Sequence, residues 1–376
     1  MQINFFRCKK CLMVSLRPRI TFKNGICNAC NNHKVLYSFN WKKRFSDLVE
    51  LAKIINKNTK FQKYNCVVPV GGGKDSSYVA WHVKNTLGLR PICVFCEPPL
   101  FTKLGKKNLD NFINSGFETI KFKHTNYMRD YDKKLFKSRG MSQHAWLTAI
   151  TIVPIKVAIK YNINYIFRGE EAESIYGGSN KNLLKKVVKF NDIGNFLLEN
   201  QELRNYYKKD KLKHFKDLFF SNNDKNLLNK IKLIYWSNFE FWDEKKHFDI
   251  AKKHCGLIIP KEKQSNAINN HSHLDQKLYA LHMYLAYIKL GFGRATTDAS
   301  IAIRLGYMNR NQGIRIVKKK DNIFPEEFLY DYLKYFNISK KYFFKILKSL
   351  VNKKIFKNSD NLLNLKLINF NRINLQ

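Results

Sequence analysis

One short segment of this chain combines glycines with charged and hydroxyl side chains. From residue 67 it reads Val-Val-Pro-Val-Gly-Gly-Gly-Lys-Asp-Ser-Ser, and a helical pattern follows. A strand that turns through glycines into a helix presents backbone N–H groups and the positive end of the helix to an anion. A lysine adds a point charge there, and serine hydroxyls add hydrogen-bond donors. The sequence therefore predicts a phosphate-binding loop made of Gly71, Gly72, Gly73, Lys74, Asp75, Ser76 and Ser77.

The spacing of the residues in this loop indicates which class of phosphate-binding motif it resembles. Neither the kinase P-loop nor the Gly-x-Gly-x-x-Gly pattern of dinucleotide folds matches it. The segment is similar to the Ser-Gly-Gly-x-Asp-Ser loop of the N-type ATP pyrophosphatases, the PP-loop superfamily, with Gly71 in place of the first serine. That departure removes one hydroxyl donor and keeps the backbone donors. The alternative is a plain glycine turn whose polar side chains cap the next helix.

Two Cys-x-x-Cys pairs lie near the start of the chain and are separated by fifteen residues. Each pair suits a tight turn that points two thiolates at one tetrahedral metal, and the spacing falls in the zinc-ribbon range. Four free or disulfide-bonded thiols are the alternative, which the even spacing disfavours. Four thiolates leave no open coordination position, so the predicted role of the Zn²⁺ is structural. The predicted ligands are Cys8, Cys11, Cys27 and Cys30.

The chain is strongly basic, with 68 Lys and Arg residues against 29 Asp and Glu residues and a net charge of +39. Such a charge attracts polyanions, anionic membrane surfaces or acidic substrates, but the abundance of Lys, Asn and Ile also fits the codon bias of an AT-rich genome. No apolar run resembles a signal peptide or a membrane span, so we expect neither. Together with a thiol metal site, this predicts a location in the cytoplasm.

Short apolar runs alternate with helical patterns between residues 61 and 175. This alternation predicts an α/β fold, a parallel sheet with helices on both faces. The longest expected helix is Gln143–Tyr161, with Pro154 inside it. In open sheets of this kind the ligand lies beyond the carboxyl ends of the strands. The expected strands are Cys66–Val70, Pro91–Phe95, Thr119–Phe122 and Asn164–Phe167.

The pattern along the chain suggests four parts. Residues 180–232 show no strand pattern and are expected to be helical, and residues 326–357 are expected to form a pair of amphipathic helices. The predicted parts are a zinc ribbon at 1–40, a linker helix at 41–60, an ATP-binding domain at 61–180 and a mainly helical substrate or partner region at 181–376.

A glycine and two carboxylates follow the last expected strand, in the sequence Arg168-Gly-Glu-Glu171. Because they follow a strand end, Gly169, Glu170 and Glu171 are candidates to face a nucleotide, its Mg²⁺ or an acceptor. The alternative is a solvated helix start, where glutamate is common.

Polar residues also surround a glycine-rich turn near residue 293. We expect two short helices here, with Asp298 capping the first, Gly306 ending it and Asn309 capping the second. Arg294, Asp298 and Arg304 are candidate contacts for an anionic sugar, with ordinary surface charge as the alternative.

Taken together, these segments resemble the N-acetyl sugar amidotransferases, PP-loop enzymes of bacterial surface-polysaccharide and flagellin-glycan biosynthesis. The ribbon and the two helices near residue 300 make this narrower than a superfamily resemblance. The matching segments are the paired Cys-x-x-Cys motifs, the loop ending at Ser77, Arg168–Glu171 with Tyr176–Gly178, Phe239–Asp243, Asp298–Ser300 with Arg304–Gly306, and Arg310–Lys320.

The resemblance implies ATP-dependent conversion of an acetamido group to an acetamidino group. ATP with Mg²⁺ would adenylate the amide oxygen, ammonia would attack the carbon, and AMP and pyrophosphate would be released. It implies a nucleotide-linked uronic acid or a nonulosonic acid such as pseudaminic acid as the acceptor. The sequence contains no recognisable glutaminase motif, so ammonia would come from a separate glutamine amidotransferase or from free ammonium.

The resemblance also implies roles for particular residues. The loop Gly71–Ser77 would hold the departing pyrophosphate, and Lys74 and Mg²⁺ would share in stabilising its charge. Asp75 would be a further catalytic residue, Glu170 would contact Mg²⁺ or the nucleotide, and Glu171 would orient the acceptor or ammonia. The candidate acceptor contacts are Tyr176, Arg294, Asp298 and Arg304.

Two other classes stay open at this stage. A PP-loop tRNA thiolase also combines this loop with zinc ribbons, and its RNA partner would suit the charge. Such an enzyme can carry a three-cysteine cluster, for which Cys93, Cys96 and Cys255 are the candidates. However, positions i and i+3 of a strand point to opposite faces, so buried thiols are the favoured interpretation of Cys93 and Cys96. A non-catalytic scaffold that retains an inactive loop is the third hypothesis.

Overall fold

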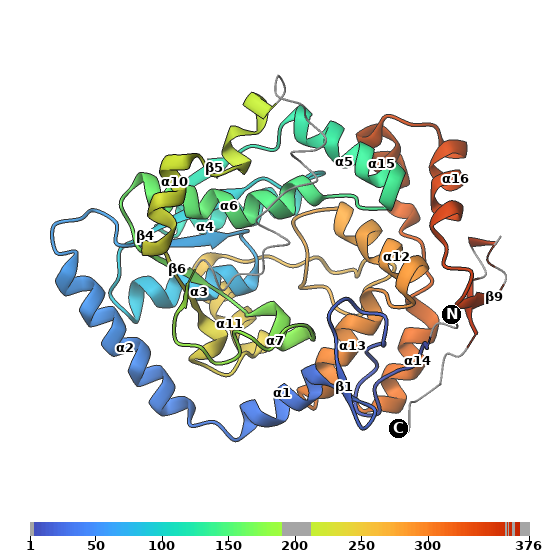
Figure 1. Cartoon of the computed structure of the whole chain (residues 1–376), viewed down its shortest axis with the longest axis horizontal. Helices are drawn as coiled ribbons and strands as arrows, with labels where there is room; N and C mark the ends of the chain where they lie inside the picture. The colour runs from blue at the N-terminus through green and yellow to red at the C-terminus, as the bar shows by residue number, and fades with distance from the viewer. Residues whose placement is uncertain (1–3, 190–211, 358, 360, 363–364, 369–376) are drawn as a thin grey trace.

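A six-stranded sheet forms the centre of the larger part of the molecule (Figure 1). The computed structural model describes residues 4–189, 212–357, 359, 361–362 and 365–368. Four of the five strand pairs in this sheet are parallel, and the edge strand β7 is antiparallel to β8. This confirms the predicted α/β fold with a parallel sheet. The strand order is β5-β4-β3-β6-β8-β7, with bounds Thr119–Phe122, Pro91–Cys96, Cys66–Val70, Tyr165–Arg168, Lys232–Tyr235 and Val188–Lys189.

The order of the strands fixes the place of a ligand site. From β3 the chain moves outward through β4 to β5, then returns to place β6 on the other side of β3, where Val67 is paired with Ile166. At such a reversal the two connections leave the sheet in opposite directions and open a crevice at the carboxyl ends of the strands. The glycine loop follows β3, and the Arg168–Glu171 segment follows β6. Both predicted motifs therefore lie at the crevice.

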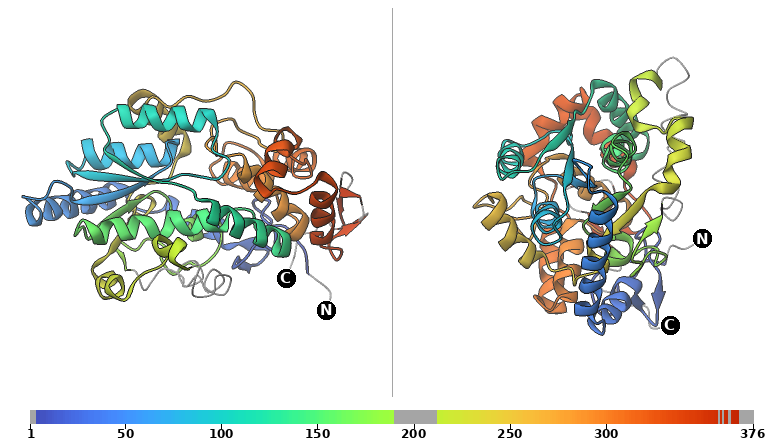
Figure 2. Two further views of the ribbon diagram at one scale, coloured as in Figure 1. Left: turned by 90° about the horizontal axis from the view of Figure 1, so that it is seen from above. Right: turned by 90° about the vertical axis from the view of Figure 1, so that its left-hand side faces the viewer.

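Two layers of helices cover the sheet (Figure 2). Strand side chains such as Val67 and Ile166 pack with α5, α6 and the 3₁₀ helix η2 on one face. Their neighbours, such as Val68 and Phe167, pack with α2, α3, α4 and α11 on the other. Alternation along each strand makes both faces apolar, as expected for a buried parallel sheet. The bounds are α2 Trp41–Asn58, α3 Lys74–Asn85, α4 Lys103–Asn114, α5 Asn126–Arg139, α6 His144–Lys160, η2 Leu212–Leu218 and α11 Glu244–Cys255.

The sequence-based expectations for the strands hold with three differences. The expected strand Pro91–Phe95 is one residue longer, Pro91–Cys96, and the expected strand Asn164–Phe167 is shifted by one residue, to Tyr165–Arg168. The expectation that residues 180–232 contain no strand was wrong, because β7 lies within them and β8 begins at residue 232. Residues 190–211 of that stretch lie outside the described part. These short strands are stabilised by pairing across the sheet, which a local pattern does not reveal.

A second core joins the two ends of the chain. Buried residues of the N-terminal segment, including Phe5 and Met13, share one apolar cluster with the helices after residue 277. The expected helix pair within 326–357 is confirmed as α15 and α16. The remaining elements are β1 Phe22–Lys23, β2 Ile26–Cys27, α1 Asn28–Tyr37, α7 Ala172–Tyr176, α10 Asn222–Leu227, α12 Leu278–Leu290, α13 Arg294–Arg304, α14 Arg310–Lys320, α15 Leu329–Phe336, α16 Lys340–Leu350, β9 Phe356–Lys357 and β10 Lys366–Leu367, with three short 3₁₀ helices at Leu228–Lys230, Trp236–Asn238 and Glu326–Phe328.

Within the described residues, none of the helices combines the length and the apolar character needed to cross a bilayer. The division of the chain into four parts at residues 40, 60 and 180 stays a prediction.

Candidate functional site

The glycine loop has the shape that an anion site needs. Gly72 has a φ of +73°, and a Cβ at this position would lie 2.9 Å from the backbone of Leu109 in α4. Gly73 is the residue before the first turn of α3, and a Cβ built there would meet no heavy atom within 4 Å. Ser76 Oγ accepts a hydrogen bond from the Gly71 N–H, at 3.1 Å. The N-terminus of α3 is thus held in place by the loop and opens onto free space.

Adding one methyl group at Gly72 is expected to destabilise the fold. Gly72→Ala would combine a strained positive φ with a backbone clash, so we expect the free energy of unfolding to fall by about 2 kcal/mol or more. Gly71→Ala is the matched control, because its Cβ would meet only Asp275 Oδ2, at 4.0 Å. Urea unfolding of the two variants tests the difference, and equal losses would show that the close approach to α4 is unimportant.

A buried network of charges lies at the first turn of α3. Lys74 Nζ is 2.6 Å from Asp75 Oδ2 and 3.2 Å from Glu244 Oε2. His247 Nδ1 is 2.8 Å from Asp75 Oδ1, so both carboxylate oxygens of Asp75 are engaged. Burial raises the pKa of Asp75, but the charge of Lys74 and the hydrogen bond from His247 outweigh it and lower that pKa below its ordinary value. Asp75 is therefore ionised and fixed in orientation.

The carboxyl group of Glu170 lies close to the same network. Burial, together with the nearby charge of Asp75, raises the pKa of Glu170 to about 7. Tyr176 Oη is 3.4 Å from Glu170 Oε1. Three carboxylates, those of Asp75, Glu170 and Glu244, thus act on one lysine. The three carboxylates are not close enough together to share one ion as a group. Mg²⁺ at a triphosphate usually takes only one or two carboxylates besides phosphate oxygens and water, and Asp75 and Glu170 suit that contribution.

The raised pKa of Glu170 has a consequence for the pH dependence of stability. A carboxyl whose folded-state pKa exceeds its ordinary value of 4.5 contributes stability below that value and loses it as the pH rises towards about 7. Glu170→Gln, which keeps the neutral form, is expected to raise the free energy of unfolding by about 1 kcal/mol near pH 8, after allowance for partial exposure. Urea unfolding near pH 5 and pH 8 measures this.

Glu118→Gln, on an exposed side chain, is the control for that measurement. Equal stabilities of wild type and Glu170→Gln at both pH values would contradict the assignment.

The other residues after β6 are placed by packing. A Cβ at Gly169 would lie 2.8 Å from the Trp242 ring, so this glycine allows the ring to pack on the strand end. Glu171 is the N-cap of α7, where its carboxylate accepts hydrogen bonds from the N–H and Oγ of Ser174. The Glu171 N–H donates to Ser237 Oγ at 2.9 Å. The carboxylate of Glu171 is thus occupied by capping α7, and its predicted role in orienting the acceptor or ammonia stays a prediction.

Two residues from the C-terminal region lie near the charge network around Lys74. The charges of Lys74 and Glu244 both affect the pKa values of Asp298 and His271. Burial, with the charge of Glu244, raises the pKa of Asp298 to about 6. The structure therefore brings Asp298 toward the loop, as one would expect of an acceptor contact, and His271 Nε2 is 3.8 Å from Glu244 Oε2.

The guanidinium group of Arg294 is almost fully buried in this interior. It donates to Gln264 Oε1 and to the Ser272 carbonyl, and its Nε is 3.7 Å from Asp298 Oδ2.

The expectation that Asp298 caps α13 was wrong, because α13 begins at Arg294 and Gly293 is its N-cap. A glycine there admits the carboxylate of Asp321, which accepts from the backbone N–H groups at the helix start. Asp298 is left free to face Arg294. The predicted end of α13 and the Asn309 cap of α14 are confirmed.

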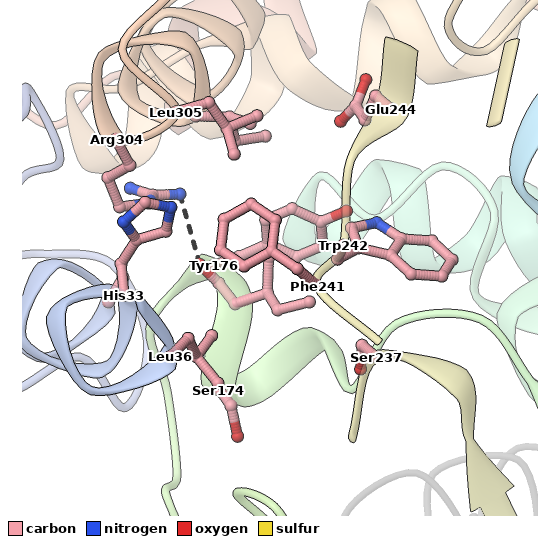
Figure 3. A pocket seen from close by; sticks show the side chains of 13 residues that line it. His33, Leu36, Ser174, Tyr176, Ser237, Phe241, Trp242, Glu244, Arg304 and Leu305 are labelled. Atoms are coloured by element: carbon pink, nitrogen blue, oxygen red, sulfur yellow. Dashed lines mark hydrogen bonds between the residues drawn. The ribbon is translucent and has the colours of Figure 1, made fainter. Parts of the chain in front are cut away.

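A pocket adjoins the network on the side of the N-terminal segment (Figure 3). Glu244 and Tyr176 connect it to the loop, since they contact Lys74 and Glu170 respectively. Arg304 lies at the opposite end beside His33, where its Nη2 donates to the Ile175 carbonyl at 3.2 Å. The lining residues are Ala29, His33, Leu36, Ser174, Ile175, Tyr176, Ser237, Phe241, Trp242, Glu244, Ile301, Arg304 and Leu305. Apolar walls with polar groups at two ends suit a small organic ligand.

The four N-terminal cysteines meet in one buried group, and their ligand atoms all lie within 4.8 Å of one another. The Sγ atoms of Cys8 and Cys30 are 3.9 Å apart, and those of Cys11 and Cys27 are 3.6 Å apart. Tetrahedral Zn²⁺ with Zn–S bonds of about 2.3 Å requires S···S separations of about 3.8 Å. The backbone N–H groups of Cys27 and Met13 donate to two of the sulfurs, an arrangement that stabilises thiolates. The donor set therefore fits Zn²⁺.

Arginines surround this cysteine group. Arg310 donates to the carbonyls of Cys8 and Cys11, each at 3.3 Å. Burial lowers the pKa of Arg304, but the nearby thiols of Cys11, Cys30 and Cys27 outweigh it and raise that pKa. Four thiolates around one divalent ion would carry a net negative charge, which these guanidinium groups balance. Arg304 therefore contacts both the cysteine group and the pocket.

The other cysteines do not form a second such group. Among the described residues, Cys8, Cys11, Cys27 and Cys30 are the one set of three or more His, Cys, Asp or Glu ligands close enough to share a metal ion. Cys93 packs on the α3 face of the sheet and Cys96 on the α6 face, as the strand geometry predicts. The three-cysteine cluster considered for a thiolase is absent from this part of the chain.

Three residues of the site were missed from the sequence. Glu244 and His247 lie one turn apart at the start of α11 and contact the loop, and Asp275 Oδ2 would be 4.0 Å from a Cβ at Gly71. Burial raises the pKa of Asp275 to about 6. The i, i+3 spacing of Glu244 and His247 was readable, but nothing in the sequence paired α11 with α3.

Comparisons with known proteins agree with parts of this description. Residues 265–371, which carry Arg294, Asp298 and Arg304, match the family described as LPS biosynthesis protein WbpG-like, C-terminal domain. No match was found among the curated proteins. Among solved structures, the ammonia-dependent NAD synthetase of Campylobacter jejuni in complex with nitrate is similar over 60% of this chain and 100% of that chain. Its sequence identity is 16% and its TM-score 0.27, so the fold assignment rests on the strand order of the sheet instead.

Proposed function

We propose that the protein is an ATP-dependent amidotransferase that converts the acetamido group of a bacterial surface sugar to an acetamidino group. The observation that carries the proposal is the glycine loop at the N-terminus of α3, located where the strand order reverses and facing Lys74 and three carboxylates. The match of residues 265–371 to an LPS biosynthesis family supports a sugar acceptor.

The chemistry suits such a site because an amide carbonyl is a poor electrophile whose oxygen is a poor leaving group. The amide oxygen attacks the α-phosphorus of ATP, and pyrophosphate leaves with the electrons of the α–β bridge bond. Ammonia then adds to the imidate carbon, the nitrogen loses a proton, and the C–O bond breaks to release AMP. The product is an amidine. The enzyme has to stabilise the charge of the departing pyrophosphate and to position three reactants.

The residues of the site divide these tasks. The backbone of Gly71–Gly73 and the hydroxyl groups of Ser76 and Ser77 would bind the pyrophosphate, and Lys74 would neutralise part of its charge. Asp75 and Glu170 would hold Mg²⁺, which supplies further neutralisation of the leaving group when bound. The cysteine group would hold a structural Zn²⁺.

The acceptor and the ammonia are the other two reactants, and neither is expected to bind to the glycine loop. Tyr176, Arg294, Asp298 and Arg304 are the proposed acceptor contacts. Tyr176 and Asp298 lie near the Lys74 network, Arg294 is 3.7 Å from Asp298, and Arg304 lies at the far end of the pocket that Tyr176 and Glu244 line. Candidate acceptors are a nucleotide-linked uronic acid and a nonulosonic acid. Ammonia would come from a separate glutamine amidotransferase or from free ammonium. These soluble substrates fit a cytoplasmic enzyme.

Incubating the protein with ATP, ammonium and candidate acetamido sugars tests the proposal. The expected products are AMP, pyrophosphate and a sugar lighter by about one mass unit, because NH replaces O. Omitting ammonium should prevent formation of that sugar. Formation of ADP instead of AMP, or sulfur transfer to tRNA with no change in any sugar, would contradict the proposed reaction.

A further inference from the structure

The proposed reaction needs a proton acceptor close to the reacting carbon. When ammonia adds to the imidate carbon, the new substituent is a positively charged –NH₃⁺ group. This group has to lose a proton before AMP leaves, because a protonated amine departs easily and would return the imidate. A carboxylate held within hydrogen-bond reach of the nitrogen is a suitable acceptor.

The reacting carbon has to lie between the glycine loop and the pocket. Its oxygen becomes bonded to the α-phosphorus, and pyrophosphate departs towards Lys74, so the rest of the acceptor extends away from the loop. Glu244 belongs to both places. Its Oε2 is 3.2 Å from Lys74 Nζ, and its side chain lines the pocket with Tyr176 and Trp242, at the end away from Arg304 (Figure 3).

The carboxylate of Glu244 has no other task in the proposed reaction. Asp75 and Glu170 are the proposed Mg²⁺ contacts, and Glu244 does not join them in a group compact enough to hold one ion. Among the described residues, the ion-pair partners of Glu244 are Lys74 and His271. A carboxylate at the junction of the phosphate site and the acceptor pocket is therefore available for the chemistry of the carbon.

We propose that Glu244 is the catalytic base of the second half-reaction, and that its carboxylate takes the proton from the ammonia-derived nitrogen. The inference rests on the proposed function, because it assigns one step of that reaction. The lone pair of ammonia forms the C–N bond, and the π electrons of the imidate move to the sugar nitrogen. An N–H bond of the –NH₃⁺ group then breaks, its proton passes to a Glu244 oxygen, and its electron pair stays on nitrogen. A C=N bond forms as the C–O bond breaks, and the electron pair of that bond leaves with AMP.

The position of Lys74 links this base to the first half-reaction. In the structure the lysine charge is shared between Asp75 and Glu244. Movement of Lys74 towards the departing pyrophosphate would free the carboxylate of Glu244, so the base becomes available once adenylation has occurred. His271 then offers a route for the proton towards solvent, because its Nε2 is 3.8 Å from Glu244 Oε2 and its side chain is 33% exposed.

Glu244→Gln tests the inference by separating the two half-reactions. The substitution keeps the shape of the side chain and an oxygen for Lys74, but it removes the base. With ATP, ammonium and an acetamido sugar that wild type converts, we expect a single-turnover burst of pyrophosphate similar to that of wild type. The rate of amidine formation should fall by about 10²-fold or more. Asp249→Asn, at an exposed position of the same helix, is the matched control and should change neither rate.

Hydroxylamine in place of ammonium tests the role of the base directly. The N–H group of its adduct is more acidic, since the attached oxygen withdraws electrons, and it loses its proton to water without a catalytic base. Glu244→Gln should therefore use hydroxylamine at close to the wild-type rate. An equal loss with both nucleophiles, or loss of the pyrophosphate burst, would show that Glu244 serves Lys74 or the fold and would overturn the inference.

The outcomes distinguish this inference from the proposed function. If wild type forms an amidine and Glu244→Gln forms it equally fast with ammonium, the inference fails and the reaction stands. If wild type forms no amidine from any acetamido sugar, the proposed function fails and the inference falls with it.

Discussion

Asp75→Asn is expected to lower the rate of AMP formation by about 10²-fold or more while leaving the fold intact. The substitution keeps the shape of the side chain but removes the charge that lies 2.6 Å from Lys74 Nζ. It also removes a carboxylate from the proposed Mg²⁺ site, so kcat should fall by a larger factor than the affinity for ATP. Chromatographic measurement of AMP with the sugar acceptor, at several Mg²⁺ concentrations, gives the size of the effect.

Asp110→Asn is the matched control, because Asp110 lies on the surface of α4 and is 3.9 Å from Lys121. It should leave the rate of AMP formation unchanged. If Asp75→Asn kept more than about half of the wild-type rate, neither the loop nor its carboxylate could be part of the reaction centre. Partial recovery of the Asp75→Asn rate at high Mg²⁺ would instead identify metal binding as the main role of this residue.

Removing one cysteine of the N-terminal group is expected to have the largest effect on stability. Cys27→Ala should abolish zinc binding and lower the free energy of unfolding by at least about 3 kcal/mol, since the binding energy of a structural metal contributes directly to folding. The group lies within the apolar cluster that includes α12, α15 and α16, so its loss would expose that core. Metal analysis and urea unfolding measure the two effects.

Cys66→Ala separates metal loss from cavity formation, because Cys66 is equally buried but lies in β3. This control should cost only about 1–2 kcal/mol and should keep the metal. Wild type is expected to contain one zinc and no iron per chain. Similar losses in the two variants, or an oxygen-sensitive iron signal in wild type, would contradict a structural zinc centre.

Features that depend on local sequence were predictable from the sequence. The glycine loop could be predicted because a strand end, three glycines and a helix start are adjacent in the chain. The cysteine group was predictable as well, since its spacing alone specifies two turns. Features that depend on pairing between distant segments were not. Strand β8 is stabilised by its parallel pairing with β6, and Glu244 reaches Lys74 because α11 packs on α3.

The misplaced cap of α13 has a similar cause. Asp298 has a side chain that commonly caps helices, and its sequence context allowed that interpretation. The structure instead uses Asp321, a residue 28 positions from the capping glycine, to accept from the N–H of Gly293. The backbone N–H groups at the start of α13 bond to a residue at the end of α14. The sequence around residue 293 therefore gives no sign of this cap.

The contacts between the two ends of the chain also constrain how the protein is made. Arg7 donates to Thr296, the Leu12 N–H donates to Ser300, and Arg310 donates to Cys8, across separations of 288 to 302 residues. A ribosome adds these partners long after the cysteines have emerged. The apolar side chains of the N-terminal segment therefore cannot pack against their partners until residues beyond 310 have been added. Late completion of this second core follows from the separation of its two halves in the sequence.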